Sequence, residues 1–214
     1  MQRRRFSQAA LGLTALTAAG SVVPMFAQAQ VTGFREGSDY RRLSRPAPVD
    51  APPGKIEVVE FFAYSCVHCY NFVPVFKGWL KTLGPDVAVR RNPVGFNAAF
   101  EPLQRLYYTL EAMDKLDTHH ELVFKAIHED RQRLNNADAI AQWAQRNGLD
   151  KAQFTQVYSS FAVTGKVRRA TQMQDAYEVE GTPALGIAGR YYIPGQAART
   201  VLVANALIAE ARKG

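Results

Sequence analysis

The sequence predicts an α/β fold in which an all-helical domain is inserted between the two halves of the α/β unit. A strand, a helix and a second strand follow one another over residues 55–94, helical patterns fill residues 97–177, and a strand, its hairpin partner and a helix end the chain. Strands that alternate with helices are typical of a sheet with parallel strands. Because only helices separate the two groups of strands, we expect an insertion and not a second tandem domain.

The first 29 residues have the features of a secretory signal peptide. Arginines occupy positions 3–5, residues 9–23 are apolar but too few to span a bilayer, and the triplet ending at Ala29 fits a small-x-small cleavage site. A short amphipathic anchor or an ordinary terminal helix is the alternative. The absence of acidic residues before Glu36 and the cleavage-like site favour export, with cleavage near Ala29. Disulfides persist in exported proteins.

The composition is that of a globular protein, with 47% hydrophobic and 21% charged residues. The formal net charge of +7 falls to +4 once the three arginines of the signal segment are left out. Basic residues elsewhere form only short runs such as Arg90-Arg91, which is not the pattern of a nucleic-acid-binding surface. No later stretch has the length and apolar character of a membrane helix. We therefore expect a soluble monomer with no nucleic-acid partner and no stable membrane insertion.

The first half of the α/β unit begins after an extended, proline-rich segment, residues 31–53, which suits at most one edge strand. Residues 55–62 are β-branched and aromatic, which is typical of a buried central strand. A helical pattern starts at Cys66 and continues to about Leu83, where Gly84-Pro85 stops it. Residues 87–94 then form the second strand.

Five segments with helical patterns, the last of them more polar, make up the predicted insertion, residues 97–176. They cover residues 103–113, 122–134, 138–147, 154–161 and 164–177.

The chain then returns to the α/β unit, which we expect to comprise residues 30–96 and 177–214. Residues 184–188 read as a strand, 190–193 as its hairpin partner, and 197–212 as a closing helix.

The chain has two cysteines, Cys66 and Cys69, at the start of the first predicted helix. A bridge between them closes a very small loop and restrains the unfolded chain little, so a structural role is excluded. Side chains three residues apart share a helix face, so the two sulfurs can join. Unpaired N–H groups and the positive helix end favour the thiolate of Cys66. His68 between them can add charge or a hydrogen bond, and Cys69 is expected to be the shielded, resolving thiol.

A stabilised thiolate makes the disulfide an oxidant that is readily passed on. Half of a zinc site is one alternative, but no second cysteine pair exists and the three histidines of the insertion have no matching spacing. An inert buried pair is another, although Tyr64-Ser65 indicates a loop-to-helix junction. For His68 alone, the alternative is an exposed helical residue without a role.

Glu60 is an acidic residue within the first strand, six residues before Cys66. One interpretation is the exposed face of an edge strand, a position that suits Glu57. If the strand is central, Glu60 is buried beneath the helix and is placed to relay protons to Cys69. A buried carboxylate needs a partner, and Arg91 on the next strand is the candidate.

Together these motifs resemble the DsbA family of periplasmic thiol:disulfide oxidoreductases. The resemblance covers about residues 40–212 and rests on Glu60-Phe61-Phe62, Cys66-Val67-His68-Cys69 and Gly181-Thr182-Pro183. It implies a thioredoxin fold with a helical insertion, Cys66 as the nucleophile, and Pro183 as a cis-proline in a substrate-binding loop with Thr182. An X-Pro bond at a strand start is otherwise usually trans.

The resemblance also implies a periplasmic enzyme that oxidises reduced, newly exported proteins and is reoxidised by a DsbB-like, quinone-linked membrane protein. We expect no metal and no cofactor. The chain departs from the family pattern at Val67, where proline is best known, at Thr182, where valine is frequent, and at Arg91, where lysine is common. Because Val67 and Thr182 lie where redox poise and substrate release are tuned, the oxidising strength stays open. A disulfide isomerase or reductase, or a non-redox peptide- or metal-binding protein, is the alternative function.

Overall fold

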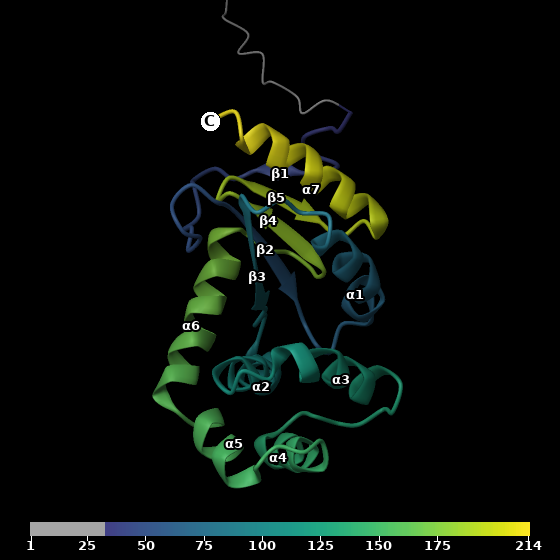
Figure 1. Ribbon diagram of the computed structural model, residues 1–214, viewed down its shortest axis with the longest axis vertical. Coiled ribbons are helices and arrows are strands. Elements are labelled where there is room, and N and C mark those ends of the chain that lie inside the picture. Colours follow the sequence, from purple (N-terminus) through teal and green to yellow (C-terminus); the bar gives the residue numbers. More distant parts are fainter. Residues whose placement is uncertain (1–32) are drawn as a thin grey trace, which may run out of the picture.

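The computed structural model describes residues 33–214, so the predicted signal peptide and its cleavage near Ala29 lie outside the described residues. A five-stranded sheet with the order β1-β5-β4-β2-β3 forms its centre (Figure 1). β2 and β3 pair in parallel, and the other neighbours are antiparallel. The strands are β1 (Arg41–Arg42), β2 (Ile56–Phe62), β3 (Val87–Pro93), β4 (Ala184–Ile187) and β5 (Tyr191–Pro194). The predicted fold class is confirmed.

Strand β2 is buried between β3 and β4, as its β-branched and aromatic sequence predicts. Helices and the lead-in segment cover both faces of the strand, so both of its acidic residues are buried. The interpretation of Glu57 as an exposed residue is therefore wrong: its exposed fraction is 1%, and its carboxylate accepts a hydrogen bond of 2.9 Å from Nε of Arg90.

Two hydrophobic layers enclose the sheet. On one face, Phe76 of α1 and Leu207 of α7 pack with Val58 of β2. On the other face, Met173 of α6 packs with Phe61 of β2 and with the segment that precedes β2. The helices are α1 (Val67–Leu80), α2 (Glu101–Ala112), α3 (Leu116–His128), α4 (Ala137–Arg146), α5 (Lys151–Tyr158), α6 (Phe161–Ala176) and α7 (Ala198–Ala211), with a 3₁₀ turn at Ala98–Phe100.

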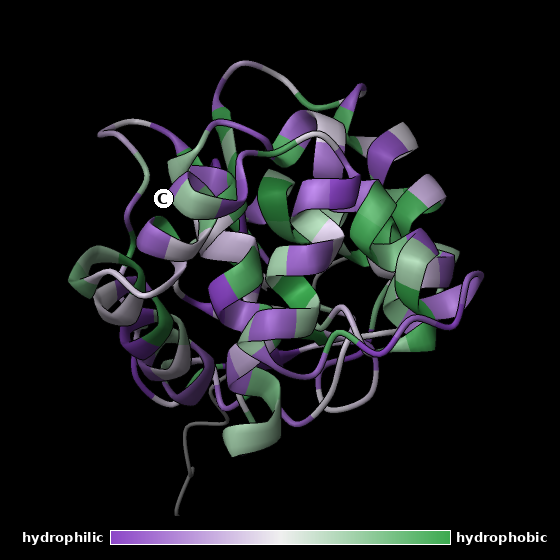
Figure 2. Ribbon diagram, turned by 90° about the horizontal axis from the view of Figure 1, so that it is seen from below, coloured by the Kyte–Doolittle hydropathy of each residue, from purple (hydrophilic) through white to green (hydrophobic). Residues whose placement is uncertain are grey.

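The predicted helical insertion is formed by α2 to α6, which follow β3 and precede β4 and extend beyond one end of the sheet (Figure 1). Its helices carry hydrophobic and hydrophilic stripes, which Figure 2 shows from below. The apolar stripes share one core with residues of the α/β unit, because Leu106 and Phe124 belong to the same buried cluster as Phe62, Tyr64 and Cys69. The insertion therefore contributes directly to the surroundings of the cysteine pair.

The structure departs from the predicted elements in details. Helix α1 ends at Leu80, three residues early. Leu134, expected on the same helix as Leu122, lies in the loop after α3 although it is buried. Arg131 precedes it in the left-handed region, with φ of 54°, which an α-helix cannot accommodate. Leu122 itself is 39% exposed on the outer face of α3.

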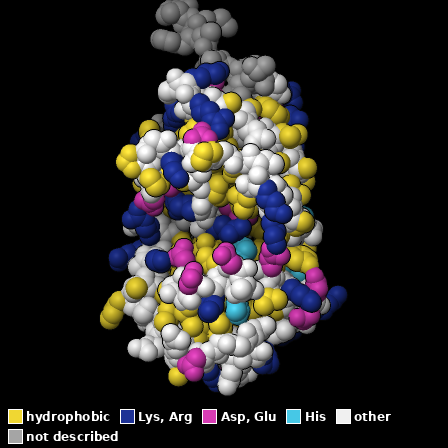
Figure 3. All heavy atoms as spheres, in the orientation of Figure 1, with side chains coloured by type: hydrophobic (Ala, Val, Ile, Leu, Met, Phe, Trp, Pro, Cys, Tyr) yellow, Lys and Arg dark blue, Asp and Glu magenta, His cyan; other side chains and the backbone are white. Residues whose placement is uncertain are grey.

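On the molecular surface, basic and acidic side chains are interspersed over the face shown in Figure 3. Several form ion pairs, such as Lys77 with Glu121 at 2.6 Å and Arg212 with Asp86 at 2.7 Å. Among the described residues, no helix has the length and apolar character needed to cross a membrane.

The packing of α7 on the sheet gives a stability prediction. Leu207 is 0% exposed, so Leu207→Ala should leave a cavity and lower the free energy of unfolding by about 2–5 kcal/mol. Leu202 on the same helix is 55% exposed, and Leu202→Ala should change it by less than about 0.5 kcal/mol. Urea unfolding of both variants measures the difference, and equal losses would contradict this account of the core.

Candidate active site

Cys66 is the N-cap residue of α1. Its backbone is extended, with φ of −88° and ψ of 115°, and its sulfur accepts the N–H of Cys69 at 3.4 Å. The N–H of Cys66 in turn donates to the carbonyl of Ala63 at 3.0 Å, which closes the turn between β2 and α1. A side chain at this position satisfies a helix N–H that has no partner within the helix. Both cysteines are free thiols, and Cys66 is partly exposed whereas Cys69 is 2% exposed.

The two thiols differ strongly in acidity. Hydrogen bonding from the Cys69 thiol, assisted by the Thr182 side chain and by the backbone N–H groups of Cys69 and His68, lowers the pKa of Cys66 to about 5, against the effect of burial. The pKa of Cys69 is raised, first by its hydrogen bond to Cys66 and then by burial. At neutral pH these shifts favour a thiolate at Cys66 beside a protonated Cys69.

The loop before β4 lies against the cysteine pair. The Thr182–Pro183 peptide bond is cis, as the resemblance implied, and the carbonyl of Thr182 accepts a hydrogen bond from the Cys66 thiol at 3.3 Å. Gly195 packs directly on the carbonyl of Pro183, where a Cβ would collide. A cavity of about 580 Å³ opens beside this loop. Its lining includes His68, Phe72, Gly181, Thr182, Pro183 and Tyr192.

His68 and Val67 are exposed at the first turn of α1. The backbone N–H of His68 is one of the groups that lower the pKa of Cys66, and its side chain lines the cavity beside Pro183. The role predicted for the imidazole, and the tuning role predicted for Val67, stay predictions.

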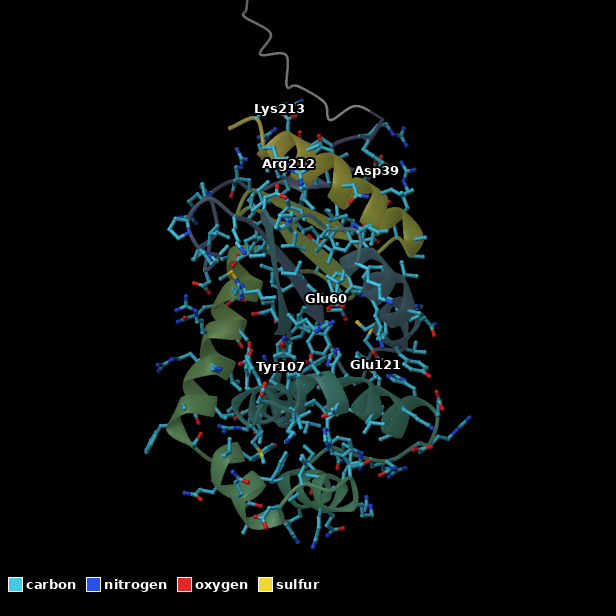
Figure 4. The ribbon with its side chains drawn as sticks, in the orientation of Figure 1. Asp39, Glu60, Tyr107, Glu121, Arg212 and Lys213 are labelled. Carbon is cyan, nitrogen blue, oxygen red and sulfur yellow. The ribbon has the colours of Figure 1, made fainter. Side chains whose placement is uncertain are left out.

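Glu60 and Arg91 lie opposite each other on β2 and β3, and Nε of Arg91 donates to the Glu60 carboxylate at 2.9 Å. Burial raises the pKa of Glu60 to about 7, and the charge of Arg91 opposes this shift. Figure 4 shows Glu60 between the sheet and the helical insertion. It lines a cavity of about 160 Å³ that it shares with Arg91, Lys77, His120 and Glu121.

Two histidines of the insertion contact this region although the sequence analysis assigned them no role. His120 shares a 2.8 Å hydrogen bond with the hydroxyl of Tyr64, and His128 donates to the backbone carbonyl of Tyr64 at 2.8 Å. The only available signal was their spacing of eight residues on one helix, which does not name a partner. Within residues 33–214, no three His, Cys, Asp or Glu side chains come together as a metal site requires.

Comparison with known proteins identifies the family. The sequence family described as "DSBA-like thioredoxin domain" matches residues 57–205. The chain is 43% identical to the thiol:disulfide interchange protein DsbA of Bordetella parapertussis over 178 residues, which are 83% of this chain and 84% of the relative. The chain belongs to the DsbA family.

Solved structures of the DsbA family have the same fold. The crystal structure of Pseudomonas aeruginosa DsbA superposes with a TM-score of 0.79 at 36% identity, covering 84% of this chain and 95% of that chain. DsbA of Xylella fastidiosa gives a TM-score of 0.78 at 27% identity, covering 84% and 98%. The chain is thus a thiol:disulfide oxidoreductase of thioredoxin-like fold with a helical insertion, and Cys66 and Cys69 are its C-x-x-C pair.

The low pKa of Cys66 gives a pH dependence of stability with a definite sign. Between about pH 5 and the ordinary thiol pKa of 9.0, the unfolded reduced chain binds a proton at Cys66 that the folded chain has lost. The free energy of unfolding therefore gains a contribution that rises with pH across this window, is complete above it, and is lost as the pH falls through about 5.

Denaturant unfolding of the reduced protein at several pH values, compared with Cys66→Ser, measures this contribution. The difference between the two proteins should grow with pH from about 5 to about 9. A difference that does not change with pH would contradict the assignment of the thiolate to Cys66.

Proposed function

We propose that this protein is an oxidant: it donates the Cys66–Cys69 disulfide to reduced, newly exported proteins. The observation that carries the proposal is the unequal acidity of the two thiols, with the pKa of Cys66 near 5 and that of Cys69 raised. A stabilised thiolate lowers the free energy of the reduced form, so the disulfide is the less stable, electron-accepting state.

In the proposed reaction, a substrate thiolate attacks the sulfur of Cys66. A bond forms between the substrate and Cys66, the Cys66–Cys69 bond breaks, and Cys69 leaves with the electron pair and takes up a proton. A second substrate thiolate then attacks the substrate sulfur of the mixed disulfide, and Cys66 leaves as a thiolate. The substrate gains a disulfide and loses two electrons, which the enzyme accepts.

Reoxidation runs through the same two sulfurs. The Cys66 thiolate attacks a disulfide of a DsbB-like, quinone-linked membrane protein, and Cys69 resolves the resulting mixed disulfide. Membership of the DsbA family supports such a partner and a periplasmic location after cleavage near Ala29. The low pKa of Cys66 favours its release from the substrate and its attack on the membrane protein's disulfide. A thiolate is both a good leaving group and a good nucleophile.

The other site residues support this chemistry in the proposal. Thr182 and Pro183 present backbone to an extended substrate peptide, His68 stabilises the Cys66 thiolate, and Val67 tunes the redox potential. We further propose the division into an α/β domain of residues 30–96 and 177–214 and a helical domain of residues 97–176.

Replacing each cysteine separates their roles. Cys66→Ser should abolish disulfide transfer to a reduced protein substrate. Cys69→Ser leaves the nucleophile but removes the resolving thiol, so it should accumulate a mixed disulfide with oxidised glutathione that non-reducing mass spectrometry detects. Two results with Cys66→Ser would contradict this assignment: disulfide transfer to the substrate, or a stable glutathione adduct at Cys69. Either would make Cys69 the residue that forms the mixed disulfide.

Glu60 is proposed to exchange the proton of Cys69, supported by its burial and a pKa of about 7, which lets it hold or release a proton near neutral pH. Glu60→Gln should slow disulfide exchange about tenfold or more at pH 7, while the pKa of Cys66 stays near 5. The matched control is Glu57→Gln, which also removes a buried acid of β2 that is paired with an arginine. Equal slowing in stopped-flow assays of both variants would contradict the relay.

A further inference from the structure

Helix α3 of the insertion presents three aromatic or imidazole side chains on one face, at positions 120, 124 and 128. Residues four apart on a helix are neighbours on its surface. This face contacts the chain on both sides of the C-x-x-C motif, because the Phe124 ring lies 5.0 Å from that of Tyr64 and 6.1 Å from that of Tyr70. Tyr64 precedes Cys66 by two residues, and Tyr70 follows Cys69 directly.

His128 makes the most specific of these contacts. Its Nε2 lies 2.8 Å from the carbonyl oxygen of Tyr64, and because a carbonyl only accepts, Nε2 carries the proton and donates it. Its ring stacks on Tyr70, with centroids 5.1 Å apart and planes inclined by 8°. One side chain of the insertion therefore fixes the backbone before the motif and the first side chain after it.

His120 holds the other end of Tyr64. Its Nδ1 and the Tyr64 hydroxyl are 2.8 Å apart. Burial lowers the pKa of His120 to about 3, and burial raises the pKa of Tyr64 well above its ordinary value, so both groups are neutral at working pH. Tyr64 is 1% exposed and is thus held by its hydroxyl and its carbonyl, each through a histidine of α3.

We propose that His128 is a positioning residue for disulfide exchange, with His120 as its support. The turn that His128 holds contains Ala63, whose carbonyl accepts the N–H of Cys66. The sulfur of Cys66 accepts the N–H of Cys69, a directional hydrogen bond that stabilises the thiolate. In its thiol form the same sulfur donates to the Thr182 carbonyl. Hydrogen bonds weaken steeply with misalignment, so a displaced turn weakens the contacts that stabilise the thiolate. The inference rests on the proposed role of Cys66 as the sulfur that forms the mixed disulfide.

The test compares three replacements of His128 in the full-length mature protein. His128→Gln places an amide N–H near the position of Nε2, His128→Asn is too short to reach the Tyr64 carbonyl, and His128→Leu has no donor. The readouts are the pH titration of the Cys66 thiolate by ultraviolet absorbance and the equilibrium constant with glutathione.

A matched control lies on the same helix. His119 is buried whereas His128 is half-buried, and Nε2 of His119 lies 3.2 Å from the carbonyl of Asn147, away from the cysteine pair. His119→Leu therefore removes a comparable bond and reports the effect of lost stability alone.

We expect the Asn and Leu variants of His128 to raise the pKa of Cys66 and to make the disulfide less oxidising by at least about threefold in the glutathione equilibrium, the effect of losing part of one hydrogen bond. His128→Gln and His119→Leu should match the unmodified protein in both readouts. If Leu prevents folding, the Asn and Gln pair decides, since both are polar amides that differ in reach.

An unchanged Cys66 titration in His128→Asn, or an equal shift in His119→Leu, would overturn the inference. These outcomes are distinct from a failure of the proposed function. That failure would appear in the unmodified protein, as a Cys66 of low pKa that does not oxidise reduced substrate proteins.

Discussion

A sulfur atom at the start of a helix is the feature on which the site depends. Cys66 takes the N-cap position of α1, where its sulfur accepts a backbone N–H, while Cys69 lies one turn further in and is buried. The same covalent group is thus acidic at one position and weakly acidic at the other. The Cys69 thiol donates a hydrogen bond to the sulfur of Cys66. This bond lowers the pKa of Cys66 and raises the pKa of Cys69. This asymmetry distinguishes the two sulfurs: in the proposed reaction Cys66 forms the mixed disulfide and Cys69 resolves it.

Three parts of the fold meet around the cysteine pair. The junction of β2 and α1 supplies Cys66, the loop before β4 supplies the cis Thr182–Pro183 bond, and α3 of the insertion supplies the histidines that hold Tyr64. The insertion and the C-x-x-C motif share one hydrophobic core, so the helical insertion forms part of the surroundings of the cysteine pair. Its apolar residues exclude water from Cys69, and burial opposes the charged form of that thiol.

Local patterns in the sequence predicted most of the architecture. The apolar run of β2, the helix at Cys66, the succession of helices in the insertion and the pairing of Glu60 with Arg91 all follow from spacing within a strand, a helix or two adjacent strands. The burial of Glu57 did not, because it depends on helices packing over both faces of β2. The bond from His128 to Tyr64 spans 64 positions, and no periodicity links residues so far apart. The sequence resemblance supplied the cis-proline, which local preference alone would have made trans.

In the proposed function, the low pKa of Cys66 makes its disulfide with Cys69 a strong electron acceptor. The equilibrium constant between the oxidised protein and reduced glutathione tests it most directly, because it compares this disulfide with a reference couple without any protein substrate. We expect the equilibrium to lie toward reduced protein and oxidised glutathione at neutral pH. An equilibrium in which the protein stays oxidised in the presence of reduced glutathione would contradict it, since the Cys66 thiolate would then not be stabilised.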